Sequence, residues 1–316
     1  MSNHVDAERT RDALVVFPGA LGDFICFLPA LREIARRAGR TPLLLAKETL
    51  APLVRLTALA RPHPIEAREG SWLFSASPPP DAMSFFGGFS SIECFTGHGV
   101  PEVDANLRRF GAGSARVHPF RPSTPEHLAL HFLRSIGGSA DELPQARLDL
   151  PAGLLEAARR RARLNRIPLL VVHPGSGGVG KRWSREGFAR IASRWARERG
   201  EAMIVLGPAE SSEAAFWESR GLETKSALDL VELAALLAIS DAYLGNDSGA
   251  SHLAAAAGAR GVVLFGPTDP ERWRPLSSRL RVVRPPLWSG VDERASEAMI
   301  RSVDQALAQA LADGSP

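Results

Sequence analysis

The sequence predicts an α/β protein with two domains, each built around a parallel sheet. Short apolar runs of strand length alternate with longer segments of helical period, which is the pattern of parallel strands joined by helices. The 316 residues are enough for two domains of ordinary size. A turn-rich stretch, GGSADELPQARLDLP at residues 137–151, separates the two halves. We therefore expect one domain over residues 1–150 and a second over residues 151–316.

The first half opens with a clear strand and helix. Residues 13–17 form an apolar run of strand length, and residues 22–38 follow helical period. Residues 42–46 are predicted as a second strand. Beyond residue 60 the sequence is richer in proline, glycine and serine, and the pattern there indicates strands around Trp72 and Phe85.

The second half alternates more regularly between strands and helices. Its predicted strands are residues 169–173, 203–206, 242–244 and 262–265. Its predicted helices are residues 185–199, 211–219, 228–238, 248–257 and 296–311. In the last helix the apolar residues recur at intervals of three and four, so one face of it is expected to lie on the core.

Composition and spacing argue against several functional classes. No apolar run approaches the roughly 18 residues that span a bilayer, and the first dozen residues are polar, so we expect a cytoplasmic protein. Cys26 and Cys94 lie far apart, which predicts neither a disulfide framework nor a zinc site. No basic stripe is interleaved with aromatic residues, so nucleic acid is not an expected partner.

A cluster of arginines follows the predicted domain junction. It consists of Arg159, Arg160, Arg161, Arg163 and Arg166. On a helix these side chains form a solvated face, or they attract an anionic membrane surface or an acidic partner.

The loop VVFPGALGDF leads from the first strand into the first helix and carries an acid. Ligands of open parallel sheets bind beyond the carboxyl ends of the strands, where such loops lie. Asp23 falls in the first turn of the helix, where it can cap free amides or act as a general base for an acceptor hydroxyl. The loop lacks the G-x-G-x-x-G dinucleotide fingerprint, which argues against a nicotinamide-dependent oxidoreductase.

Two loops of the second half carry groups suited to a nucleotide. In VVHPGSGGVGKRW, the backbone amides of Ser176 and Gly177 and the Ser176 hydroxyl can hold phosphate oxygens, and Lys181 adds a positive charge. The alternative is a flexible loop with a surface lysine. In IVLGPAE, Glu210 opens a helix, where it can cap the helix or bind a pair of ribose or sugar hydroxyls.

The stretch GNDSGASHL concentrates polar residues at a further helix start. Asp247 and Ser248 begin the helix, Gly249 permits close approach of a ligand, and His252 lies one turn after Ser248. Their amides and side chains converge on the positive end of the helix dipole, which suits a pyrophosphate. Asp247 and His252 alone do not make a metal site. The alternative is a structural cap with a hydrogen-bonded histidine.

Together these motifs resemble glycosyltransferase family 9, the ADP-heptose:lipopolysaccharide heptosyltransferase family. The matching stretches are PGALGDFICFLPAL, HPGSGGVGKRWSREGFARIA, LGPAE and residues 230–275. The resemblance implies a GT-B fold, in which two Rossmann-like domains with parallel sheets face a cleft and the C-terminal one binds the nucleotide-sugar. It also implies inverting transfer of heptose from ADP-heptose, without a metal or another cofactor, to a lipid-linked saccharide.

The resemblance assigns roles position by position. Asp23 corresponds to the catalytic base, and Glu210 to a contact with the nucleotide ribose. The other implied donor contacts are Ser176, Gly177, Lys181, Asp247, Ser248, Gly249 and His252. The expected partners are a nucleotide-sugar and a glycan or glycolipid acceptor, for which Arg108, Arg109, Arg116 and Arg121 are candidate contacts. A lipid-linked acceptor would bring the protein to the inner face of the inner membrane. A non-catalytic nucleotide-sugar-binding protein is the alternative.

Overall fold

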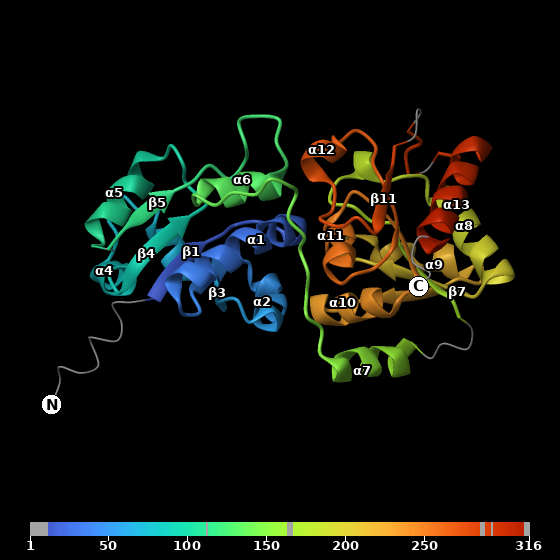
Figure 1. Cartoon of the computed structure of the whole chain (residues 1–316), viewed down its shortest axis with the longest axis horizontal. Helices are drawn as coiled ribbons and strands as arrows, with labels where there is room; N and C mark the ends of the chain where they lie inside the picture. Colours follow the sequence, from blue (N-terminus) through green and yellow to red (C-terminus); the bar gives the residue numbers. More distant parts are fainter. Residues whose placement is uncertain (1–11, 112, 163–166, 285–287, 292, 313–316) are drawn as a thin grey trace. The chain divides into compact units, whose positions relative to one another are not determined.

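The computed structural model describes residues 12–111, 113–162, 167–284, 288–291 and 293–312. The chain divides into two compact units, unit 1 ending at Pro144 and unit 2 beginning at Gln145 (Figure 1). The sequence-based boundary falls slightly later, between residues 150 and 151. Each unit contains one sheet whose strand pairs are all parallel, so the predicted α/β class is confirmed.

Unit 1 has a five-stranded sheet in the order β3-β2-β1-β4-β5. The strands are β1 (Asp12–Val16), β2 (Leu43–Ala46), β3 (Arg61–Pro64), β4 (Phe89–Cys94) and β5 (Ala115–Val117). The helices are α1 (Leu21–Ala38), α2 (Ala51–Thr57), α3 (Arg68–Trp72), α4 (Pro80–Phe86), α5 (Pro101–Arg109) and α6 (Leu128–Ser135), and η2 (Glu48–Leu50) is a 3-10 turn. The order of strands reverses between β1 and β4.

The strands predicted around Trp72 and Phe85 are wrong. Trp72 ends α3 and Phe85 lies in α4. Their aromatic side chains favour strands by intrinsic propensity, but here short helices pack them near the sheet, and the two rings lie 6.4 Å apart between centroids. The strands of this region escaped detection because β3 contains two prolines, which only an edge strand tolerates, and β5 is very short.

An aromatic cluster supports the loop that follows β1. The Phe17 ring stacks on Phe27 with centroids 4.4 Å apart and meets Phe132 of α6 edge-on at 5.6 Å. A Cβ atom at Gly19 would come within 2.4 Å of the Phe17 ring and 2.8 Å of the Asp23 Cβ. Only glycine therefore permits the chain to pass this closely between the cluster and the start of α1.

Unit 2 has a six-stranded sheet in the order β11-β10-β9-β6-β7-β8. The strands are β6 (Leu169–His173), β7 (Glu201–Leu206), β8 (Glu223–Ser226), β9 (Ala242–Asn246), β10 (Gly261–Leu264) and β11 (Leu280–Val283). The helices are α7 (Ala152–Ala162), α8 (Arg185–Glu198), α9 (Ala214–Glu218), α10 (Leu230–Ile239), α11 (Gly249–Ala256), α12 (Pro270–Trp273) and α13 (Glu297–Ala312); η3 (Val179–Lys181) and η4 (Pro208–Glu213) are 3-10 turns. The order of strands reverses between β6 and β9.

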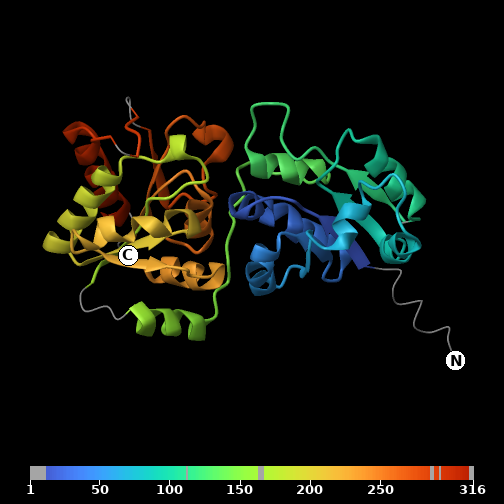
Figure 2. The same ribbon diagram turned by 180° about the vertical axis from the view of Figure 1, so that it is seen from behind.

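Most elements predicted in the second half are present in unit 2. The helix predicted at 211–219 is divided, because η4 precedes the shorter α9. The main core lies where α8 and α13 cover β6, β7, β9 and β10. Helix α7 packs beside α10, as both views show (Figures 1 and 2). Arg159, Arg160 and Arg161 lie in the last turn of α7, whereas Arg163 and Arg166 lie outside the described residues.

Two further sequence expectations can be compared with the described residues. Cys26 and Cys94 are both buried and are not joined in a disulfide, as their spacing predicted. Across the described part of the chain, no helix combines the length and apolar character that crossing a bilayer requires.

Gly261 holds the start of β10 against β9. Its φ is 149°, and a Cβ atom there would lie 1.9 Å from the Tyr243 carbonyl oxygen. We expect Gly261→Ala to lower the free energy of unfolding by at least about 3 kcal/mol, because the sheet must shift to relieve the overlap. Urea denaturation measures the free energy of unfolding. Gly153→Ala, at an open position in α7, is the control and should leave stability unchanged or raise it by up to about 1 kcal/mol. A loss below about 1 kcal/mol in Gly261→Ala contradicts the argument.

Candidate active site

All predicted site residues except Glu210 follow a strand at the point in each sheet where the strand order reverses. Ligands of open α/β sheets bind beyond the carboxyl ends of the strands at this point. In unit 1, Asp23 follows β1, one of the two strands at the reversal. In unit 2, the loops after β6 and β9 flank the reversal and contain Ser176, Lys181 and Asp247.

Asp23 is held by two kinds of donor. Its Oδ2 accepts a hydrogen bond from the Ala20 amide at 3.1 Å, as an acid in the first helical turn commonly does. Its Oδ1 accepts from Arg121 Nη1 at 2.7 Å, and the Arg121 guanidinium lies 4.6 Å from the centre of the Phe120 ring. The side chain remains 17% exposed. Asp23 therefore caps α1, as one interpretation predicted, and keeps an accessible carboxylate.

Ser176, Lys181 and Asp247 are brought together across β6 and β9. The Ser176 hydroxyl donates to the Asp247 carbonyl oxygen at 2.7 Å. Lys181 Nζ donates to Asp247 Oδ2 at 2.8 Å, and Thr268, after β10, donates to the same oxygen at 2.7 Å. Asp247 is buried, whereas the Lys181 side chain is 38% exposed. The Lys181 ammonium group is thus oriented by the Asp247 carboxylate and is still accessible to an anion. We call Ser176, Lys181 and Asp247 the lysine cradle.

Asn246 fixes the backbone beneath the lysine cradle. Its side-chain amide donates to the Pro174 carbonyl oxygen at 2.7 Å, and its Oδ1 accepts from the Trp183 amide at 3.1 Å. Asn246 and Trp183 are fully buried. The asparagine therefore joins the end of β9 to the loop after β6 and to the start of α8. Sequence analysis missed this role, although the adjacent Asp247 pointed to the right loop.

The start of α11 supplies the remaining predicted residues. Ser248 is the N-cap, and its Oγ accepts from the Ser251 amide at 3.4 Å. Gly249 is the first helical residue and is partly exposed. His252 is buried one turn further on, where its amide donates to the Ser248 carbonyl oxygen at 3.3 Å. The structural cap is therefore present, and the open amide end lies directly after Asp247. Gly177 is exposed in the loop after β6, with open space around its Cα.

Glu210 lies after β7 and does not contact the lysine cradle directly. Its carboxylate forms an ion pair with Arg182, the residue after Lys181, and Arg182 also contacts Glu213 at 3.2 Å. Among the described residues the Glu210 carboxylate accepts no hydrogen bond from a helix amide, so the capping interpretation is not supported. The sequence analysis assigned a role to Lys181 and none to the adjacent Arg182.

His173 ends β6 next to Gly207 and is buried, which lowers the pKa of its imidazole to about 4. In the unfolded chain the pKa is near 6.5, so as pH falls the unfolded state takes up a proton first. We expect the free energy of unfolding to drop by about 2 kcal/mol between pH 7 and pH 5 through this residue. Denaturation at pH 7 and at pH 5 should show a smaller drop in the free energy of unfolding for His173→Asn than for the unaltered protein. His98→Asn, at an exposed position, is the control. If the drop for His173→Asn equals the drop for the unaltered protein, the assignment to His173 is contradicted.

Unit 1 holds a second polar cluster at the carboxyl ends of β4 and β5. Glu93 is buried and forms an ion pair with Arg116, and its Oε2 lies 2.6 Å from His118 Nε2. Burial raises the pKa of Glu93, but the hydrogen bonds from His118 and Arg116 outweigh it and hold the pKa below its usual range. The sequence indicated only Arg116 of these three.

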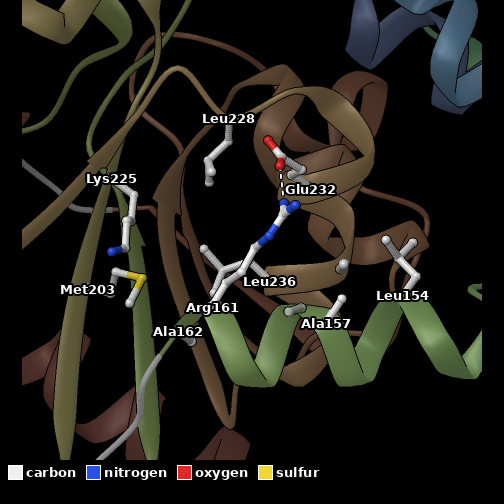
Figure 3. A pocket seen from close by; sticks show the side chains of 11 residues that line it. Leu154, Ala157, Arg161, Ala162, Met203, Lys225, Leu228, Glu232 and Leu236 are labelled. Atoms are coloured by element: carbon white, nitrogen blue, oxygen red, sulfur yellow. Dashed lines mark hydrogen bonds and ion pairs between the residues drawn. The ribbon is translucent and has the colours of Figure 1, made fainter.

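An apolar cavity of about 230 Å³, partly open to solvent, lies elsewhere in unit 2. It is formed between α7, α10 and the strands β7 and β8, as Figure 3 shows. Arg161 and Glu232 form an ion pair at its rim, and Lys225 is paired with Glu223. No predicted site residue lines this cavity.

Within residues 12–111, 113–162, 167–284, 288–291 and 293–312, no group of three or more His, Cys, Asp or Glu side chains is arranged to hold an ion.

Comparison with known proteins finds a family model and curated sequences that match about half of the chain, and solved structures that share its whole fold. The model of a family described as glycosyltransferase family 9 (heptosyltransferase) matches residues 128–299. Lipooligosaccharide heptosyltransferase 2 of Haemophilus influenzae is 29% identical over 181 residues, which are 50% of this chain and 50% of that protein. Lipopolysaccharide heptosyltransferase 2 of Escherichia coli is 29% identical over 177 residues, 50% of this chain and 49% of that protein. The chain thus spans about half the length of the curated relatives it matches.

Solved structures resemble the chain over nearly its full length. The structure of E. coli ADP-heptose lipopolysaccharide heptosyltransferase II superposes with a TM-score of 0.77 at 17% identity, covering 96% of this chain and 99% of that one. At this identity the likeness establishes the fold. The GT-B fold expected from the sequence is therefore confirmed.

Proposed function

Because the chain belongs to glycosyltransferase family 9, we propose that it transfers heptose from ADP-heptose to a hydroxyl of lipopolysaccharide or a related cell-surface glycan. In this proposal unit 2 binds the nucleotide-sugar and unit 1 serves the acceptor. The acceptor is a glycan or glycolipid, and a lipid-linked acceptor would bring the protein to the inner face of the inner membrane from the cytoplasm.

The lysine cradle is the observation that carries the proposal. An exposed ammonium group, oriented by a buried carboxylate, lies beside the amide end of α11. A departing diphosphate gains negative charge, and fixed cationic and amide donors stabilise that charge best when they are oriented in advance. Lys181, the Ser176 and Gly177 loop, and the start of α11 at Ser248 and Gly249 would bind the diphosphate, while Asp247 and His252 would complete the donor site.

The proposed reaction is a single displacement. The acceptor oxygen attacks the anomeric carbon from the face opposite the diphosphate, a new glycosidic bond forms, and the bond to the diphosphate oxygen breaks. The acceptor proton passes to Asp23, whose partly exposed carboxylate is oriented by Arg121 and the Ala20 amide. The configuration at the anomeric carbon inverts. Lys181 and the helix amides supply the charge stabilisation for which other transferases use a metal ion.

The test is product analysis with purified protein, ADP-heptose and a heptose-free lipopolysaccharide core as acceptor. We expect ADP and glycoside in equal amounts, inverted configuration, and a rate unaffected by EDTA. Retained configuration or loss of the rate in EDTA contradicts the mechanism. Binding of ADP-heptose without ADP release would favour the non-catalytic alternative.

A further inference from the structure

Arg182 joins the two glutamates of η4 to the loop after β6. We infer that Arg182 is a positioning residue that holds the Glu210 carboxylate for the donor ribose, and so makes the site selective for ribonucleotides over 2′-deoxyribonucleotides. This inference rests on the proposed function, in which Glu210 binds the ribose. It gives a role to a side chain that would contact no substrate atom itself.

The backbone on both sides of Arg182 is fixed. The Arg182 amide donates to the Val179 carbonyl oxygen at 3.0 Å. The next amide, of Trp183, donates to buried Asn246 at 3.1 Å. The Arg182 side chain is only 12% exposed, and its Nε donates to no group in the described part of the chain. Its two Nη atoms, directed at Glu210 and Glu213, therefore determine where the guanidinium lies.

The Glu210 carboxylate is confined on its other sides. A Cβ atom at Gly175 would lie 2.6 Å from Glu210 Oε2, and one at Gly207 would lie 2.8 Å from the same oxygen. Oε1 accepts from Arg182, and no described residue donates to Oε2. The absence of side chains at Gly175 and Gly207 therefore leaves Oε2 free to accept hydrogen bonds from a pair of hydroxyls.

Electrostatics make Arg182 necessary for this arrangement. Glu210 is 4% exposed, and a buried carboxylate without a cation is strongly disfavoured. Nearby His173 cannot supply the charge at neutral pH, because burial lowers its pKa to about 4. Lysine in place of Arg182 would keep the charge but not the planar fork that reaches both glutamates. Both Arg182→Met and Arg182→Lys should therefore let the Glu210 carboxylate move.

The experiment measures dissociation constants for ADP and 2′-deoxy-ADP by calorimetry. In the unaltered protein we expect ADP to bind roughly 10- to 100-fold more tightly, because a hydrogen bond to a charged group is lost with the 2′-hydroxyl. In Arg182→Met this ratio should fall to about twofold or less, and in Arg182→Lys to less than a third of the original. Arg220→Met, which removes an exposed partner of Glu186, is the control and should keep the ratio.

The ratio of the two dissociation constants distinguishes a positioning role from a general loss of stability, because partial unfolding weakens the binding of ADP and of 2′-deoxy-ADP equally. If Arg182→Met does not fold, Arg182→Lys alone gives the answer. An unchanged ratio in Arg182→Lys overturns the inference while leaving the proposed function intact. Equal binding of both nucleotides by the unaltered protein also overturns it. Failure to bind ADP at all would overturn the proposed function, and the inference with it.

Discussion

Asp23→Asn is expected to lower the rate of transfer by about 10³-fold, within the range that general bases contribute, and to leave ADP affinity within about twofold. Asparagine has nearly the same shape, and its one side-chain oxygen can still accept the hydrogen bond from the Ala20 amide, whereas its Nδ2 group cannot accept the bond from Arg121. The cap of α1 is thus retained while the proton acceptor is lost. Steady-state kinetics with saturating ADP-heptose, together with calorimetry, measures both quantities.

The control for this variant is Asp81→Asn. Asp81 also lies in the first turn of a helix, α4, but its side chain is highly exposed. It should transfer at the original rate. If Asp23→Asn keeps more than about a third of the rate, Asp23 serves only as a cap and the base must be sought elsewhere.

Lys181→Met is expected to lower kcat by about 10² to 10³-fold and to weaken ADP binding at least about tenfold, because a preoriented cation at the diphosphate is lost. The affinity for adenosine, which carries no phosphate, should not change. This difference between ADP and adenosine distinguishes a diphosphate contact from general damage to unit 2. Kinetics and calorimetry with both ligands measure the effect.

Removal of Lys181 also deprives buried Asp247 of its cation, although Thr268 still donates to it. Lys181→Met with Asp247→Asn therefore serves as a second variant in which no unpaired charge is buried. Lys225→Met is the matched control, since Lys225 pairs with Glu223 on an exposed edge. Unaltered ADP affinity in both Lys181 variants would exclude the lysine cradle as the diphosphate site.

The local pattern of apolar residues predicted the central strands of each sheet and the loops that follow them. The runs at residues 13–17 and 169–172 are continuously apolar because β1 and β6 are covered on both faces, and the structure buries nearly every residue in them. Edge strands lack this signature. β8 reads ETKS and has no buried residue, so nothing in its composition distinguishes it from a loop.

Contacts between distant segments could not be predicted in the same way. Arg121 and Asp23 are 98 residues apart, and only the pairing of β1 with β4 and of β4 with β5 brings their loops to one edge of the sheet. Arg182 and Glu210 belong to loops of the adjacent strands β6 and β7. The sequence indicated which loops carry chemistry, whereas the ion pairs that orient those groups required the fold.

The most direct test is a crystal structure of the protein with ADP, grown in the presence of EDTA. The account predicts diphosphate oxygens within hydrogen-bond distance of Lys181 Nζ, of the Ser176 loop and of the first amides of α11, with no ion between them. A diphosphate bound away from Lys181, or one that requires a metal ion to bind, would contradict it.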